Sequence, residues 1–152
     1  MPRIWLLNGF ALLDGSDGFT PRRCDIEIEH GRIAAIREAG TARPDPPDEI
    51  VDAQHLLISP GFVNAHTHSP DNLIRGSAPL LPLELWSLSS AAGREGRTAR
   101  ETYVAAMLGC IEMARSGVTT LLDHIRFSPH PVPDGLDAIG AAYRDSGLRA
   151  VI

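Results

Sequence analysis

Two helix ends of nearly the same design limit what this chain can fold into. Arg115-Ser116-Gly117-Val118 and Asp145-Ser146-Gly147-Leu148 both pass from a helical pattern through Ser-Gly into an apolar strand, and they lie 30 residues apart (115 to 145). A glycine just past a helix is a common stop signal, and this spacing is roughly the length of one strand–helix unit. The repeat predicts a parallel sheet joined by right-handed helical crossovers.

The chain from residue 59 onward follows this alternation. Thr98 and Glu101 form a capping box that should begin the first helix, and apolar residues follow at helical spacing. The interval 69–97, with three prolines, is expected to be a long connecting segment. The expected elements are a strand at 62–67, a helix at 98–117, a strand at 118–123, a proline-rich loop at 126–133, a helix at 134–147 and a strand at 148–152.

The first 58 residues predict a small antiparallel sheet instead. Asn8-Gly9 is a strong hairpin dipeptide between two apolar runs, although a bulge within one long strand is an alternative. His30-Gly31 is expected to be a turn, and the three prolines within 40–48 indicate a loop. Strand candidates are 4–7, 10–13, 25–29, 32–36, 49–52 and 55–58. Such a sheet is too thin to form a complete core.

His66 and His68 are the strongest candidates for chemistry. Side chains two apart on a strand point the same way, so the two imidazoles should lie side by side at one strand end. Neutral imidazole is the commonest protein metal ligand. Strict alternation places Asn64 on the same inner face and Val63 on the outer, helix-covered face. The alternative is a pair of histidines in ordinary hydrogen bonds; the increasingly polar inner face favours a metal.

Composition excludes several classes of function. The chain is 43% hydrophobic with a formal net charge of −5, and its arginines are scattered, so it lacks the basic footprint of a nucleic-acid-binding protein. No stretch is apolar and long enough for a membrane span or a signal peptide. Cys24 and Cys110 have no metal-like spacing and indicate free thiols in a reducing compartment. We expect a soluble cytoplasmic protein with no nucleic-acid or membrane partner.

Several motifs occur in a characteristic order: 60–68 (Pro-Gly-Phe-Val-Asn-Ala-His-Thr-His), 69–76, Leu83-Glu84-Leu85-Trp86, then 117–120 with Asp123 closing a strand. Together they resemble the amidohydrolase superfamily, and most closely its cytosine deaminase, S-adenosylhomocysteine deaminase and triazine hydrolase branch. The resemblance runs over all 152 residues and covers only the first third or so of a typical member. It implies an α/β fold, with the N-terminal part of a β-sandwich at 1–58. The first strands and helices of an incomplete (β/α)₈ barrel would follow at 59–152.

The same resemblance implies one catalytic Zn²⁺ per chain, or alternatively Fe²⁺, with His66 and His68 as its first-strand ligands. In the family the remaining ligands and the proton-shuttling glutamate come from later strands. We therefore expect the catalytic acid/base downstream of Ile152, and an incomplete site in this chain alone. Asn64 stands where binuclear members usually carry an aspartate, which favours the mononuclear, deaminase-like branch.

Other residues near the expected barrel mouth receive weaker assignments. Trp86 and Glu84 are candidates for substrate contact, with loop packing as the alternative for Trp86. We expect Arg75 to pair with a loop carboxylate, with anchoring of an acidic group as the alternative. We expect Asp123 and His124 to form a hydrogen-bonded strand end rather than part of the site. The remaining histidines, which should be solvated, are His30, His55 and His130.

The expected activity is hydrolysis of a carbon–nitrogen bond other than a peptide, in which metal-activated water deaminates or dechlorinates an aminated heterocycle. The expected partner is that small molecule, and the full-length protein should be a homo-oligomer. Because a complete barrel needs roughly 250 residues, we expect an N-terminal part of a larger protein, or one piece of a split one. Two alternatives remain: a complementing, non-catalytic fragment that assembles with a partner chain, and a binuclear hydantoinase- or dihydroorotase-like cyclic amide hydrolase.

Overall fold

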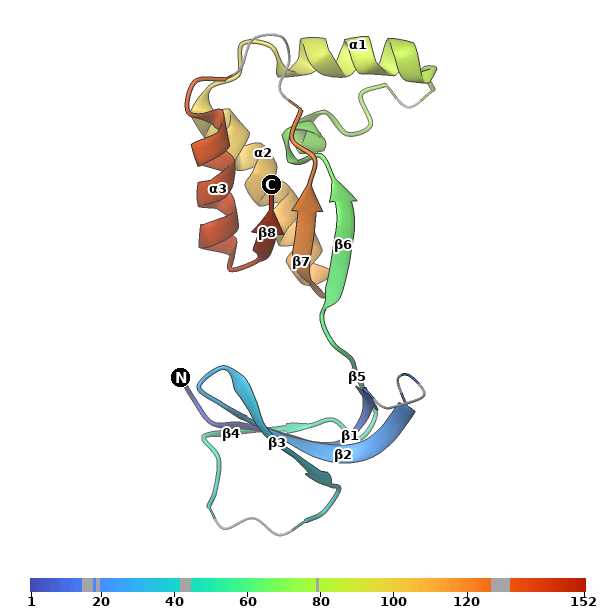
Figure 1. Ribbon diagram of the computed structural model, residues 1–152, viewed down its shortest axis with the longest axis vertical. Coiled ribbons are helices and arrows are strands. Elements are labelled where there is room, and N and C mark those ends of the chain that lie inside the picture. Colours follow the sequence, from blue (N-terminus) through green and yellow to red (C-terminus); the bar gives the residue numbers. More distant parts are fainter. Residues whose placement is uncertain (15–17, 19, 42–44, 79, 127–131) are drawn as a thin grey trace. The chain divides into compact units, whose positions relative to one another are not determined.

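The computed structural model describes residues 1–14, 18, 20–41, 45–78, 80–126 and 132–152 (Figure 1). The chain divides into two compact units, Met1–Pro60 and Gly61–Ile152. Each unit is described by itself below. Among the described residues, no helix is long and apolar enough to cross a membrane.

The first unit is a five-stranded mixed sheet with the order β3-β2-β1-β4, in which β5 also pairs with β1. β1, β2 and β3 are antiparallel, but β4 and β5 run parallel to β1, so the expectation of a purely antiparallel sheet is wrong. After β3 the chain crosses to the other side of β1 and pairs there in the same direction. The strands are β1 (Ile4–Leu13), β2 (Thr20–Glu29), β3 (Arg32–Glu38), β4 (Glu49–Asp52) and β5 (Leu57–Ile58).

Asn8-Gly9 forms a bulge inside one long strand, which was the alternative to a hairpin. The register of β1 on β2 shifts between Leu6 and Gly9, and Asn8 has a left-handed φ of 60°. The buried carboxylate of Asp25 accepts a hydrogen bond from the Asn8 backbone at 2.7 Å. A Cβ on Gly9 would come within 2.4 Å of Ile58 Cδ1, so the bulge also needs a residue without a side chain.

The second unit is a three-stranded parallel sheet in the order β6-β7-β8, as the helix–Ser-Gly–strand repeat predicted. Two helices, α2 and α3, pack against it through one cluster of buried side chains (Figure 1). The cluster consists of Ala106, Cys110, Leu121, Ile139, Ala142 and Tyr143. The elements are β6 (Phe62–Thr67), the 3₁₀ helix η1 (Ser69–Ile74), α1 (Leu83–Arg94), α2 (Ala99–Arg115), β7 (Val118–Asp123), α3 (Gly135–Ser146) and β8 (Arg149–Val151).

The predicted helix boundaries hold. Thr98 Oγ1 accepts from the Glu101 backbone at 3.2 Å while the Glu101 carboxylate accepts from the Thr98 backbone at 2.8 Å, which completes the capping box. Gly117 and Gly147 follow α2 and α3 with φ of 79° and 75°. Only glycine adopts this left-handed conformation without steric cost, so both helices end where the Ser-Gly motif placed their ends.

The segment 69–97 is not a simple connection, because it holds η1 and α1. Pro70 lies in the first turn of η1 and Pro82 is the N-cap of α1, so these prolines begin helical elements rather than break them. The guanidinium of Arg94, near the end of α1, pairs with the Asp71 carboxylate of η1. In Figure 1, α1 lies on the side of the sheet toward which β6 and β7 point.

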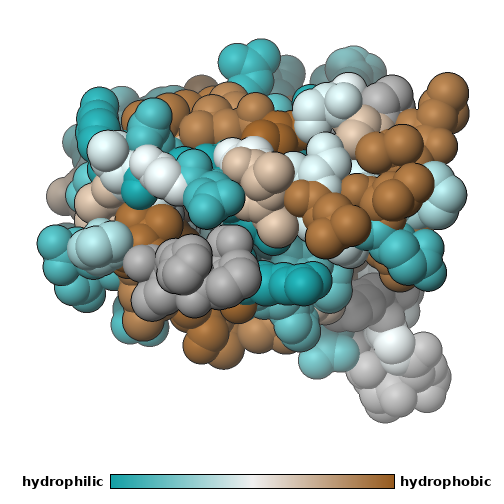
Figure 2. Space-filling view, turned by 90° about the horizontal axis from the view of Figure 1, so that it is seen from above, coloured by the Kyte–Doolittle hydropathy of each residue, from teal (hydrophilic) through white to brown (hydrophobic). Residues whose placement is uncertain are grey.

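Large apolar side chains remain exposed on this unit. On α1, Leu83 and Leu88 are 70% and 69% exposed, and Val63 on β6 is 68% exposed. Figure 2 looks from the side on which α1 lies and shows hydrophobic surface there. Exposed apolar patches on soluble proteins often mark interaction sites.

Candidate metal centre

The two histidines of the H-x-H motif lie together at the carboxyl end of β6. Their Nε2 atoms are 3.1 Å apart, and their ring centroids are separated by 4.8 Å with the planes nearly perpendicular. Both side chains are accessible to solvent. Two nitrogens bound tetrahedrally to one Zn²⁺, each at about 2.0–2.1 Å, would lie roughly 3.3–3.4 Å apart. The donor atoms of His66 and His68 are therefore spaced nearly as a single ion requires.

The tautomer of His68 is set by its other ring nitrogen. His68 Nδ1 lies 2.7 Å from the backbone carbonyl oxygen of His124. Because a carbonyl only accepts, Nδ1 carries the proton, so in the neutral form of the ring the lone pair lies on Nε2. A second hydrogen bond of this kind is the usual way in which a protein orients a ligating histidine.

Strict alternation along β6 proved wrong for Asn64. Its side-chain amide lies 3.5 Å from Met113 Sδ on α2, and its strand partner is Leu121, which is buried against the helices. Asn64 thus lies on the helix-covered face, while Val63, predicted to face the helices, is largely exposed. Asn64 and Val63 therefore lie on the opposite faces of β6 from those predicted.

A β-bulge accounts for the difference. Asn64 pairs with Leu121 and Thr67 pairs with Asp123, so three steps along β6 match only two along β7. The extra residue in β6 changes which side chains share a face beyond the bulge. The Asn64 Oδ1 atom accepts from the His66 backbone at 3.2 Å and closes the bulged segment.

His124 belongs to the same place, although the sequence assigned it to a plain strand end. Its ring centroid is 4.6 Å from that of His66 and 6.1 Å from that of His68. Carboxyl ends of neighbouring parallel strands meet at one edge of a sheet, and that signal would have placed His124 beside the H-x-H pair. Within the described residues, however, no three His, Cys, Asp or Glu side chains converge as a metal-binding group.

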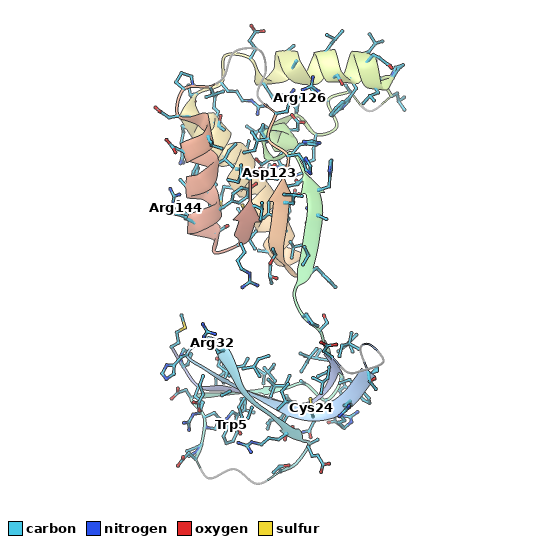
Figure 3. All side chains as sticks on the ribbon, viewed as in Figure 1. Trp5, Cys24, Arg32, Asp123, Arg126 and Arg144 are labelled. Atoms are coloured by element: carbon cyan, nitrogen blue, oxygen red, sulfur yellow. The ribbon has the colours of Figure 1, made fainter. Side chains whose placement is uncertain are left out.

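Asp123 is a hydrogen-bonded strand terminus, as predicted. It is buried at the end of β7 (Figure 3), where its carboxylate accepts from Ser69 and from Tyr143. Burial, and then the hydrogen bond to Asp123, raises the pKa of the Tyr143 phenol well above its ordinary value. Tyr143 therefore keeps its proton and acts as a donor.

The remaining predicted residues lie away from the imidazoles or outside the described part. Glu84 is exposed in the first turn of α1, and Trp86 lines a cavity of about 250 Å³ whose lining does not include the histidines. Arg75, which also lines that cavity, pairs with Glu112 at 2.6 Å, so it has the structural role expected of it, but its partner lies on the helix α2 and not in a loop. His30 and His55 are exposed. The proline-rich interval that holds His130 lies largely outside the described residues.

A parallel strand–helix sheet with polar side chains at the carboxyl ends of its strands is the arrangement of (β/α)-barrel enzymes. The amidohydrolase family model matches residues 57–152, and the chain belongs to this family.

Relatives and solved structures agree with the family. The chain is 38% identical over 150 residues to the 5-methylthioadenosine/S-adenosylhomocysteine deaminase of Thermococcus onnurineus, which is 98% of this chain and 32% of the relative. It is 36% identical over 148 residues to the 5'-deoxyadenosine deaminase of Methanothermobacter thermautotrophicus, covering 97% of this chain and 32% of that one. The chain spans about a third of the length of the curated relatives it matches.

Among solved structures, an amidohydrolase from an environmental sample of the Sargasso Sea superimposes with a TM-score of 0.71 at 29% identity, over 99% of this chain and 33% of that chain. The atrazine chlorohydrolase of Arthrobacter aurescens complexed with zinc gives a TM-score of 0.79 over 97% of this chain and 34% of that chain. Its 21% identity shows the fold alone. The predicted fold class and family are confirmed.

Proposed function

We propose that this chain supplies the first metal-binding strand of a hydrolase that acts on carbon–nitrogen bonds and deaminates an aminated heterocycle. The observation that carries the proposal is the imidazole pair of His66 and His68, with Nε2 atoms 3.1 Å apart at a strand end. The alternative, an ordinary hydrogen bond between two surface histidines, explains only the distance between the two Nε2 atoms. It does not explain why the pair lies at the carboxyl end of the first strand of a sheet in this family.

The residues present fit one divalent ion. His66 and His68 would hold it through Nε2, and the hydrogen bond from His68 Nδ1 keeps the proton off His68 Nε2, whose lone pair faces His66 Nε2 at 3.1 Å. Imidazole nitrogen suits Zn²⁺ and Fe²⁺ alike, so both are compatible. When bound, such an ion supplies water activated for hydrolysis near neutral pH. Two imidazoles alone bind weakly, since open zinc sites usually have three protein ligands.

The substrate class follows from what the relatives are named for. Those names include adenine nucleosides, and a structural neighbour is an atrazine chlorohydrolase. Both kinds of molecule present an electron-poor ring carbon that bears a leaving group. Trp86 offers an aromatic face for such a ring, and Glu84 a carboxylate for its amino groups. We propose both as substrate contacts contributed by α1.

A second candidate is a complementing fragment, favoured by the exposed apolar side chains of α1 and β6. In this case the chain would assemble with a partner that completes the barrel, and only the assembly would turn over substrate. Sedimentation of the chain with and without the partner separates the two. For the full-length protein, a homo-oligomer and a cytoplasmic location are part of the proposal.

Zinc binding tests the proposal directly. The experiment measures the metal bound after dialysis against Zn²⁺. It compares the wild-type chain with the His66→Ala and His68→Ala variants and with a His55→Ala control. His55 is an exposed histidine of the other unit, so the control should bind like the wild type while both site variants lose the metal. Unchanged binding in the site variants would refute the metal site. Two metals per chain in the full-length protein would favour the binuclear alternative.

A further inference from the structure

The end of β7 holds the His68 segment by three separate contacts. The backbone ladder ends where the His124 N–H donates to the Thr67 carbonyl at 2.9 Å. Beyond it, the Asp123 carboxylate accepts from the Ser69 backbone at 3.1 Å and from the Ser69 hydroxyl at 2.5 Å. The third contact is the hydrogen bond from the His68 ring to the His124 carbonyl.

The Asp123–Ser69 contact continues the pairing of the two strands by one more residue, with the Asp123 carboxylate as acceptor in place of a backbone carbonyl. Ser69 directly follows His68 and is 1% exposed, and Asp123 is 3% exposed, so water does not compete for these hydrogen bonds. A carboxylate that accepts from both a backbone and a hydroxyl donor fixes position and orientation together. The contact therefore fixes the backbone on the C-terminal side of His68 relative to β7.

The ring contact of His68 depends on that placement. The acceptor, His124, belongs to β7, whereas the donor belongs to the segment that leaves β6. A shift of the His68 backbone relative to β7 would lengthen the 2.7 Å hydrogen bond and free the ring to change tautomer or rotate.

We propose that Asp123 is a positioning residue of the metal site, which acts through Ser69 to keep the His68 imidazole protonated at Nδ1 with its Nε2 free for the ion. The inference rests on the proposed metal-binding role of His68. It assigns Asp123 more than the stability of a strand end, and the structure offers a variant that separates the two roles.

That variant is Tyr143→Phe. The Tyr143 hydroxyl, which comes from α3, donates to the same Asp123 oxygen as the Ser69 hydroxyl, also at 2.5 Å, and interacts with the Ser69 hydroxyl as well. Removing it weakens the buried network but leaves both hydrogen bonds from Ser69 to Asp123 in place. Ser69→Ala removes the hydroxyl on the His68 side, and Asp123→Asn changes the acceptor itself.

The experiment compares the three variants with the wild-type chain in three measurements. These are thermal unfolding, Zn²⁺ affinity by competition with a chelating dye, and the imidazole ¹H–¹⁵N spectrum, which reports the His68 tautomer without metal. We expect Ser69→Ala and Asp123→Asn to lower Zn²⁺ affinity about tenfold, as loss of an outer hydrogen-bond partner typically does, and to mix the His68 tautomers. Tyr143→Phe should lower the unfolding temperature yet retain both the affinity and the Nδ1–H tautomer.

The possible outcomes separate a positioning role of Asp123 from a purely structural one. If all three variants lose affinity in proportion to stability, Asp123 acts only as a strand end and the inference is refuted. An unchanged His68 tautomer in Ser69→Ala refutes it as well, even if Asp123→Asn fails to fold. If the wild type does not bind Zn²⁺ through its histidines, the proposed function fails. The tautomer measurement on the metal-free chain then still tests the positioning.

Discussion

The ion pair between Asp71 and Arg94 should be strongly asymmetric in its response to substitution. It joins η1 to the end of α1, and its side chains are 17% and 8% exposed. Replacing Asp71 with asparagine leaves the Arg94 guanidinium buried without its counter-charge. Replacing Arg94 with methionine leaves Asp71 beside a second cation, Arg97, which donates to the neighbouring Pro70 carbonyl.

The magnitudes follow from these surroundings. Breaking a buried pair by removing one partner costs about 3–5 kcal/mol, and we expect about 3 kcal/mol for Asp71→Asn because the carboxylate is partly exposed. Burial lowers the pKa of Arg97, and the negative charge of Asp71 opposes that shift. Asp71→Asn removes this charge, so it should also lower the Arg97 pKa further and make its buried positive charge less favourable. Arg94→Met should cost only about 1 kcal/mol, since it also removes the Arg94 Nε, which is buried without a hydrogen-bond partner.

Denaturant unfolding followed by Trp86 fluorescence measures these losses of stability close to the ion pair, because Trp86 lies on α1 together with Arg94. Trp5 is the only other tryptophan, so Trp5→Phe serves as the common background. The double variant should lose less than the sum of the single losses by about 2 kcal/mol, the coupling of the pair. If Arg94→Met destabilises the fold as much as Asp71→Asn, then a buried guanidinium without its counter-charge is not the cause of the larger loss.

Three further outcomes can be checked separately. Gly109→Ala should destabilise the fold by about 1–3 kcal/mol in denaturant unfolding, because a Cβ there would lie 2.3 Å from Asn72 Nδ2. Burial raises the pKa of the Cys24 and Cys110 thiols, so neither should react with Ellman's reagent at pH 8 until the chain unfolds. The backbone hydrogen bond at the start of α2 lowers the pKa of Glu101 below 4.5. Its stabilisation is present above that pH and lost as pH falls through the lower folded value, so Glu101→Gln should remove this part of the acid dependence seen in unfolding titrations.

Local signals in the sequence placed most of the second unit correctly. Gly117 and Gly147 end their helices in the left-handed conformation, and the capping box of Thr98 begins α2. These features depend on a few neighbouring residues, so they can be inferred without knowledge of the tertiary structure. The parallel order of the three strands followed from the repeat, because short helical crossovers leave few other topologies.

Features that depend on distant contacts were missed. The three prolines within 69–97 predicted a long connection, yet Pro70 and Pro82 stand at helix starts. The partner that fixes the end of α1, Asp71, is 23 residues away from Arg94. Likewise β4 and β5 pair in parallel with β1 after a long excursion, and no local pattern distinguishes that pairing from a hairpin return.

The bulge in β6 explains why His66 and His68 lie side by side as predicted, although Asn64 and Val63 lie on the opposite faces from those predicted. A period of two predicted that the two histidines share a side, and they do, but the same period placed Asn64 with them. One extra residue between Asn64 and Thr67 separates the part of β6 that packs on helices from the part that carries the imidazoles. Without the bulge, the strand that buries Asn64 against Met113 would direct His66 toward the helices as well. The bulge is therefore the local feature that allows one short strand both to join the core and to present the imidazole pair of His66 and His68.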